Sequence, residues 1–267
     1  MTDRINHLFS ENKAKNKASF IGYVCAGDPD KKTCLDVCKA LLENGVELLE
    51  LGIPFSDPLA DGLTNQLAAQ RALQAGAKLE DTFDLIRSIR SFSEAPIVLY
   101  CYYNAIFSQS VESFVVRARE AGVDGILALD LPPEEAGELV EASKKHNMKN
   151  IFIVAPTTPE DRIHKMAESA SGFIYYVSRE GVTGERSTLA TNTGEAVNLI
   201  KSKTDLPVAV GFGISTADHV RETASYADGV IVGSALVNCI AKNLGNPAEI
   251  VRVIGNKAKD LSKGLES

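Results

Sequence analysis

Residues 48–62 read LLELGIPFSDPLADG and contain two carboxylates in informative places. The run begins with apolar residues interrupted only by Glu50, and a continuous apolar run is typical of a strand covered on both faces, as in a parallel sheet. An ionised carboxylate there costs several kcal/mol unless it is paired or its pKa shifts. We therefore expect Glu50 to have a chemical role rather than a structural one. Asp61, on the loop that follows, is a second candidate, with the alternative that it only precedes a helix beginning near Thr64.

Short apolar runs alternate with amphipathic segments along the whole chain. Eight runs of strand length are expected, at residues 20–24, 47–51, 97–101, 125–129, 151–154, 173–177, 208–210 and 229–232. Helices are expected between them, at residues 31–44, 80–92, 110–121, 133–146, 159–169, 193–204 and 216–226. Eight such units in about 250 residues favour an α/β protein with a (β/α)8 TIM barrel. A doubly wound open sheet is the alternative.

Two further helices are expected to cap the barrel. One precedes the first strand, at about residues 2–13, and one is a long C-terminal helix at residues 247–261. Thr158 is expected to cap the helix that begins at Pro159, because proline is favoured at the first helical position. No stretch is typical of an interdomain linker, so we expect a single domain over residues 1–267.

The composition argues against several functional classes. The net charge is −7 and no basic cluster is present, which argues against a nucleic-acid partner. No apolar stretch approaches the roughly 20 residues of a membrane span, and the first residues lack a secretory signal. The five cysteines show no C-x-x-C pairing and are typical of reduced thiols, so a cytoplasmic location is expected. The four histidines are scattered singly, so no metal site is expected.

Barrel enzymes carry their chemistry at the carboxyl ends of the strands. Glu50 ends the second expected strand and Asp61 lies on the loop after it. Tyr102 follows the third strand, and Tyr175 lies in the sixth; both are expected to form pocket walls. Asp130 follows the fourth strand, and we expect it to shape a turn or cap a helix rather than to act in catalysis.

Two glycine clusters predict a phosphate site. The first, Gly211-Phe212-Gly213-Ile214-Ser215, follows the seventh strand, and the second, Gly233-Ser234-Ala235, follows the eighth and opens a helix. Glycine lets backbone N–H groups approach an anion, and a helix N-terminus adds its dipole. The polar residues 178–187, after the sixth strand, have the composition of a mobile lid or of an ordinary surface loop.

Missing residue types narrow the expected reaction. No lysine lies at the carboxyl end of any expected strand, so a Schiff-base aldolase would lack its nucleophile. No cluster of histidine and acidic residues is placed for a catalytic metal. General acid–base catalysis by two carboxylates on a phosphorylated substrate remains.

Several motifs, in the same order, resemble those of the tryptophan synthase α subunit family. They are residues 27–29, 49–62, 130–135, 176–184 and 211–215, and the resemblance covers nearly the whole chain. It implies a carbon–carbon lyase that cleaves indole-3-glycerol phosphate, by a retro-aldol reaction, to indole and glyceraldehyde 3-phosphate. It also implies that this subunit carries no metal and no organic cofactor.

The resemblance implies roles for individual residues. Glu50 matches a glutamate that moves a proton between the glycerol 3′-hydroxyl and indole C3. Asp61 matches a carboxylate that holds the indole N–H as positive charge develops, and Thr183 matches a lid residue that reaches it. Including Tyr102 as a pocket wall, the expected substrate-binding residues are Tyr23, Tyr102, Tyr175, Thr183, Gly184, Phe212, Gly213, Gly233 and Ser234.

The resemblance further implies a partner. In the family, a β subunit carrying pyridoxal phosphate receives indole through a tunnel within an α2β2 heterotetramer. Several positions depart from the family pattern. Leu63 and Asn65 stand where proline and isoleucine are usual, and Cys25 replaces a threonine. Tyr100-Cys101 replaces smaller or aliphatic residues, and Ala128-Leu129 replaces a common isoleucine-proline pair. Two alternatives therefore stay open, a catalytically weak regulatory subunit and a stand-alone lyase that releases indole.

Overall fold

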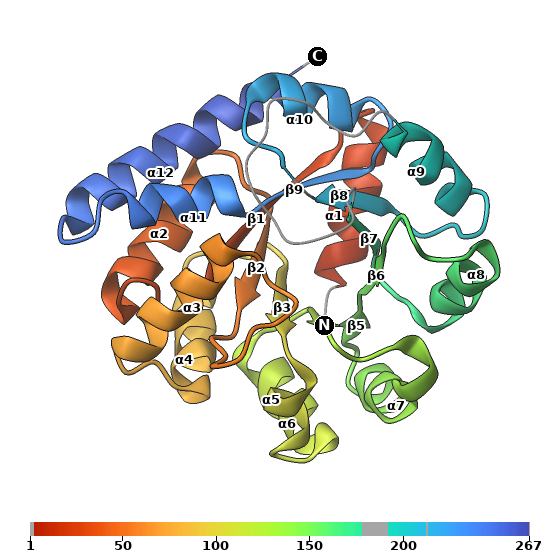
Figure 1. The fold of residues 1–267 in the computed structure, drawn as a ribbon, viewed down its shortest axis with the longest axis horizontal. Coiled ribbons are helices and arrows are strands. Elements are labelled where there is room, and N and C mark those ends of the chain that lie inside the picture. Colours follow the sequence, from red (N-terminus) through yellow and green to blue (C-terminus); the bar gives the residue numbers. More distant parts are fainter. Residues whose placement is uncertain (1–2, 178–191, 212, 267) are drawn as a thin grey trace.

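A parallel sheet curled into a barrel forms the centre of the molecule in a computed structural model, which describes residues 3–177, 192–211 and 213–266 (Figure 1). The strand order is β5-β4-β3-β2-β1-β9-β8-β7-β6, and every pair is parallel. The strands are β1 (Ser19–Cys25), β2 (Leu48–Gly52), β3 (Ile97–Cys101), β4 (Gly125–Ala128), β5 (Lys149–Asn150), β6 (Phe152–Val154), β7 (Ile174–Val177), β8 (Val208–Gly211) and β9 (Gly229–Val232).

The fifth strand begins at Lys149, before the expected range of 151–154, and is divided at Ile151. Its first part, β5, pairs with β4, and its second part, β6, pairs with β7. The two edges of the sheet are therefore consecutive pieces of one strand, and the sheet closes on itself. The predicted eight-stranded (β/α)8 barrel is confirmed, with this one division.

Helices surround the sheet (Figure 1). They are α1 (Arg4–Ala14), α2 (Lys31–Glu43), α3 (Leu63–Gln74), α4 (Leu79–Arg90), α5 (Tyr103–Phe107), α6 (Val111–Ala121), α7 (Gly137–Lys145), α8 (Glu160–Ser169), α9 (Thr193–Lys201), α10 (Ala217–Ala224), α11 (Ser234–Ala241) and α12 (Pro247–Ser262). The expected N-terminal and C-terminal helices are α1 and α12. Within the described residues, no helix is both long enough and apolar enough to cross a membrane.

Alternate residues of each strand face the two sides of the barrel wall, and this period places Glu50. On β2, Leu48 belongs to the inner apolar cluster, whereas Leu49 and Leu51 belong to the outer cluster under the helices. Glu50 therefore faces the interior, one inward position closer to the carboxyl end than Leu48.

The amino-terminal half of the barrel interior is filled. Helix α1 contributes Ile5 and Phe9 to the inner cluster, which otherwise consists of strand residues and their neighbours: Ile21, Leu48, Val98, Leu127, Ile151, Phe173, Ala209 and Ile231. A Cβ added at Gly125, the first residue of β4, would lie 3.1 Å from Ile5 Cδ1. Helix α1 thus packs against the amino-terminal ends of the strands, and open space remains only towards their carboxyl ends.

The predicted cap at Thr158 is wrong. Helix α8 begins at Glu160, with Pro159 in the cap position. The Thr158 hydroxyl instead accepts a hydrogen bond from the backbone N–H of Ala155, at 3.0 Å, and so closes the turn that precedes the helix. A hydroxyl committed to that turn is not available to the first helical N–H groups.

Candidate active site

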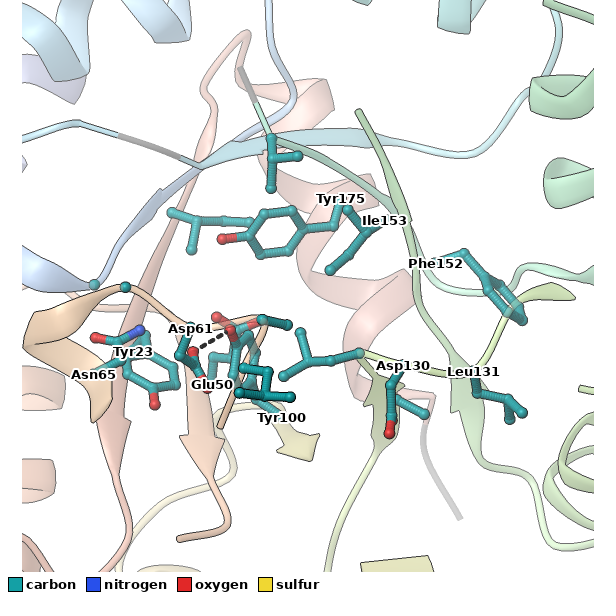
Figure 2. A pocket seen from close by; sticks show the side chains of 18 of the residues that line it. Tyr23, Glu50, Asp61, Asn65, Tyr100, Asp130, Leu131, Phe152, Ile153 and Tyr175 are labelled. Atoms are coloured by element: carbon teal, nitrogen blue, oxygen red, sulfur yellow. Dashed lines mark hydrogen bonds between the residues drawn. The ribbon is translucent and has the colours of Figure 1, made fainter. Parts of the chain in front are cut away.

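A cavity of about 660 Å³ lies at the carboxyl end of the strands. Figure 2 shows Glu50, Asp61, Tyr23 and Tyr100 on one side of it and Tyr175 on the other. The predicted residues that line it are Tyr23, Glu50, Asp61, Tyr175, Gly213, Gly233 and Ser234. The structure therefore brings most of the predicted residues, which are far apart in the chain, to one cavity.

Three predicted residues, Thr183, Gly184 and Phe212, lie outside the described part of the chain, so their roles stay predictions. Tyr102 was expected to be a wall of the pocket. It is not among the residues that line the cavity, and its hydroxyl instead donates to Asp61. Its contact with the site is therefore made through that carboxylate.

Glu50 is a buried acid with an unpaired oxygen. Its side chain is almost fully enclosed, at 1% exposure, and Oε1 has no hydrogen-bond partner among the described residues. Burial is the main cause that raises the pKa of Glu50 to about 8, and the nearby charge of Asp61 adds to it. At neutral pH the carboxyl is therefore mostly protonated and able to give a proton to a bound molecule.

Asp61 has a different environment. Tyr100 donates its hydroxyl to Asp61 Oδ1 at 2.7 Å (Figure 2), and Tyr102 donates to Oδ2 at 2.9 Å. Burial raises the pKa of Asp61 above its usual range, while hydrogen bonds from Tyr100, Tyr102 and Asn65 oppose the rise. Both carboxyls on the cavity therefore have raised pKa values, but hydrogen bonds to both oxygens favour the ionised form of Asp61, whereas Glu50 Oε1 has no hydrogen-bond partner among the described residues.

Asp61 precedes α3 by two residues, as the alternative expectation had it, but it does not cap the helix. The cap position belongs to Gly62, with no side-chain hydrogen bond to the helix. The backbone of Asp61 is fixed separately, because its N–H donates to Pro58 O at 3.0 Å and its carbonyl accepts from Gln66 Nε2 at 2.8 Å. The carboxylate is therefore not used to cap α3, and it lines the cavity with its two tyrosine partners.

The glycine segments lie at the same cavity. Gly213 has φ of +69°, a conformation that favours glycine, and a Cβ added there would meet nothing within 4 Å. Gly233 is the cap residue of α11 and Ser234 is its first residue. The backbone N–H groups at the start of this helix can bind an anion at the rim of the cavity, as expected for a phosphate.

The sequence did not reveal the role of Tyr100. It was noted only as an unusual residue, although strand period could have placed it: Val98 belongs to the inner cluster, so Tyr100, two residues on, faces inward as well. Asp130 behaves as expected for a cap, because its Oδ1 accepts from the backbone N–H of Tyr103, the first residue of α5, at 2.6 Å.

A buried ion pair lies next to the site, and the sequence analysis did not predict it. Asp28, on the loop after β1, is fully buried, and Arg71 on α3 donates to both of its oxygens, at 2.8 and 2.7 Å. The pair ties the loop after β1 to the helix that follows Asp61. Among the described residues, no group of three or more histidine, cysteine or acidic side chains could hold a metal ion.

Comparisons with known proteins find relatives over nearly the whole chain. The family model described as tryptophan synthase alpha chain matches residues 9–266. A tryptophan synthase alpha chain of Opitutus terrae is 56% identical over 263 residues, covering 98% of this chain and 99% of that protein. One of Methanoregula boonei is 46% identical over the full length of both chains, 267 residues of this one.

Solved structures are similar throughout as well. A structure of Mycobacterium tuberculosis tryptophan synthase has a TM-score of 0.91 and 33% identity, covering 100% of both chains. A structure of the tryptophan synthase α2β2 complex of Pyrococcus furiosus has a TM-score of 0.85 and 38% identity, covering 92% of this chain and 98% of that one. The sequence motifs, the barrel and these relatives agree: the chain belongs to the tryptophan synthase alpha chain family.

Proposed function

We propose that this chain, as the α subunit of a tryptophan synthase, cleaves indole-3-glycerol phosphate to indole and glyceraldehyde 3-phosphate. One observation carries the proposal: two buried carboxyls in different environments face one cavity, Glu50 with an unpaired oxygen and Asp61 with hydrogen bonds to both oxygens. A retro-aldol cleavage of this substrate needs an acid for carbon C3 of indole and an anion for the indole N–H.

The first step is proton transfer to the indole ring. Protonated Glu50 gives its proton to C3, and the ring becomes an iminium ion with its positive charge shared with the ring nitrogen. Asp61 accepts a hydrogen bond from that N–H and stabilises the charge as it develops. The protonated ring can then take up the electrons of the C3–C3′ bond.

The second step breaks the carbon–carbon bond. Glu50, now a carboxylate, removes the proton of the 3′-hydroxyl, and the oxygen forms the carbonyl of glyceraldehyde 3-phosphate. The electrons of the C3–C3′ bond return to the ring and restore neutral indole. Glu50 has regained its proton, so one group serves as acid and then as base with no net proton change.

The remaining residues bind the two ends of the substrate. Tyr23 and Tyr175 supply aromatic surface on either side of the cavity, which suits a flat indole ring. Gly213, Gly233 and Ser234 offer backbone N–H groups to the phosphate at the rim. These assignments, like the catalytic roles of Glu50 and Asp61, are parts of the proposal.

We also propose a tryptophan synthase β chain as the partner, in an α2β2 assembly in which the β chain carries pyridoxal phosphate. The α2β2 structure from Pyrococcus furiosus supports this. So do apolar side chains left in solvent near the cavity mouth and on α5: Leu59 is 89% exposed, and Leu63 and Phe107 are each 64% exposed. A protein partner would cover such residues.

The test is indole release from indole-3-glycerol phosphate by the purified chain, alone and with a tryptophan synthase β chain. We expect slow release alone and a large increase with the β chain, with no activity in either condition for Glu50→Gln. The relatives do not favour the regulatory subunit or the stand-alone lyase. Absence of indole in both conditions would refute the proposed reaction, and fast release without a β chain would refute dependence on the partner.

A further inference from the structure

The loop that carries Asp61 is joined to the barrel wall largely through two tyrosines of one region of the chain. This loop, residues 53–62, follows β2 and contains Leu59, which is 89% exposed. At its start, Ile53 N–H donates to the carbonyl of Tyr100 at 2.9 Å. At its end, the hydroxyls of Tyr100 and Tyr102 both reach Asp61.

The two tyrosines hold different oxygens of the same carboxylate. Tyr100 donates to Oδ1 and Tyr102 to Oδ2, and the Tyr102 hydroxyl also accepts from the backbone N–H of Ala60 at 3.0 Å. A carboxylate held at one oxygen can rotate about its Cβ–Cγ bond, whereas one held at both oxygens has a single orientation. Each oxygen keeps a lone pair for a further donor, so this arrangement does not exclude a ligand N–H.

The Tyr100 ring is itself held in place. It packs edge-on against Tyr23, with ring centroids 5.0 Å apart, and it lies on β3 in register with Gly52 of β2. Its hydroxyl is therefore presented from a rigid strand to a side chain on a loop. Rigid elements are the usual supports of groups that need precise placement.

We propose that Tyr100 is a positioning residue for Asp61, whose phenol anchors the loop after β2 and orients the carboxylate into the cavity before substrate enters. The inference rests on the proposed function, because it assigns Tyr100 a part in the same cleavage. Tyr100 need not touch the reacting atoms; its effect is exerted through Asp61.

The hydrogen bond from Tyr100 also shifts the pKa of Asp61 in a direction that can be measured. Donation from Tyr100 favours the ionised form of Asp61 and opposes the rise in pKa that burial causes. Removing the hydroxyl raises the pKa of Asp61 further, so its protonation occurs at a higher pH. The titratable and polar groups that interact with Asp61 from the surrounding elements are Tyr23, Cys25, Glu50, Asn65, Tyr100, Tyr102 and Tyr175. In Tyr100→Phe only one of them changes.

The experiment compares Tyr100→Phe with Tyr176→Phe in the full-length chain. Tyr176 is a tyrosine of β7 that belongs to the outer apolar cluster, so it controls for loss of a strand phenol away from the cavity. Indole release is measured with a tryptophan synthase β chain present, across pH. Hydrogen–deuterium exchange of the 53–62 segment is measured in the chain without ligand.

We expect Tyr100→Phe to lower kcat/KM by about tenfold to a hundredfold, as for one hydrogen bond to a charged group. In Tyr100→Phe, the acid limb of the kcat/KM–pH profile moves to higher pH, and the backbone amides of residues 53–62 exchange faster. Tyr176→Phe changes none of these quantities. Unchanged kcat/KM would overturn the inference. A lower rate with the acid limb and the exchange unchanged would also overturn it, because Tyr100 would then act on substrate directly. Lack of indole release by the unmodified chain would refute the proposed function instead, whereas the exchange comparison needs no activity.

Discussion

Replacing Glu50 with glutamine should stabilise the fold while abolishing cleavage. The pKa of Glu50 lies at about 8 instead of 4.5, mainly because the side chain is buried. The folded chain therefore holds this proton more tightly than the unfolded chain, and the free energy of unfolding falls as pH rises from about 4.5 to about 8. At about 1.4 kcal/mol per pKa unit, ionising Glu50 in the folded chain costs about 5 kcal/mol in full.

The free-energy cost of keeping Glu50 buried depends on pH, and a glutamine at this position has no such cost. At pH 7 the unfolded chain has already lost the proton and the folded chain has mostly kept it, so about 3 kcal/mol of the full cost applies. At pH 5 less than about 1 kcal/mol applies, and above pH 9 nearly all of it does. Glutamine resembles the neutral acid and does not ionise, so Glu50→Gln should be more stable than the unmodified chain by these amounts.

Thermal unfolding at pH 5, 7 and 9 measures this difference. For a chain of this size about 3 kcal/mol corresponds to a Tm increase of roughly 6–12 °C, expected at pH 7. The increase should be larger at pH 9 and small at pH 5. Glu120→Gln, at an exposed glutamate of α6, is the matched control and should show no such trend. A Tm difference that is the same at pH 5 and pH 9 would refute the reasoning, because it would show that Glu50 does not ionise with a raised pKa.

Three further predictions concern the site and its support. Because Glu50 must start protonated, kcat/KM for indole release should fall above about pH 8; initial rates across pH measure this, and a plateau up to pH 9.5 would contradict it. Asp61→Asn should lower kcat/KM by about a hundredfold or more, yet bind glycerol 3-phosphate with nearly unchanged Kd in calorimetry; loss of that binding would show a structural role for Asp61. Arg71→Ala leaves the buried charge of Asp28 without its ion-pair partner and should lower the free energy of unfolding by about 3–5 kcal/mol; a change below about 1 kcal/mol in denaturant unfolding would contradict this.

The barrel could be predicted from the sequence because its signal is repeated. Each strand appears in the sequence as an apolar run, and each long helix appears as an amphipathic segment. The hydrophobic period predicts the bounds of most elements to within a few residues of those in the structure. Helix α5 was missed because its five residues are too few to show a period. The start of the fifth strand at Lys149 was missed because Lys149 and Asn150 are polar, and its break was missed because Ile151 is apolar like Phe152. Both features depend on pairing with β4 and β7.

The candidate site was predictable where a residue type conflicts with its local setting. Glu50 stands out because an acid interrupts an apolar strand, and the glycine clusters stand out because they follow strands directly. The link from Tyr100 to Asp61 joins residues 39 positions apart, and the ion pair of Asp28 and Arg71 joins residues 43 positions apart. A tyrosine in a strand and an arginine in a helix give no local sign of their partners, so these contacts depend on strand register and loop path, which one sequence does not specify.

The filled amino-terminal half of the barrel makes the cavity a blind pocket. Ile5 and Phe9 of α1 and the inner side chains above them occupy the space through which a product could otherwise pass down the barrel axis. If the proposed reaction takes place in this cavity, then within the part of the chain that the structure describes indole departs by the rim through which substrate entered. A second chain that receives indole must therefore sit over that rim, and by sitting there it would also shut the product away from bulk water.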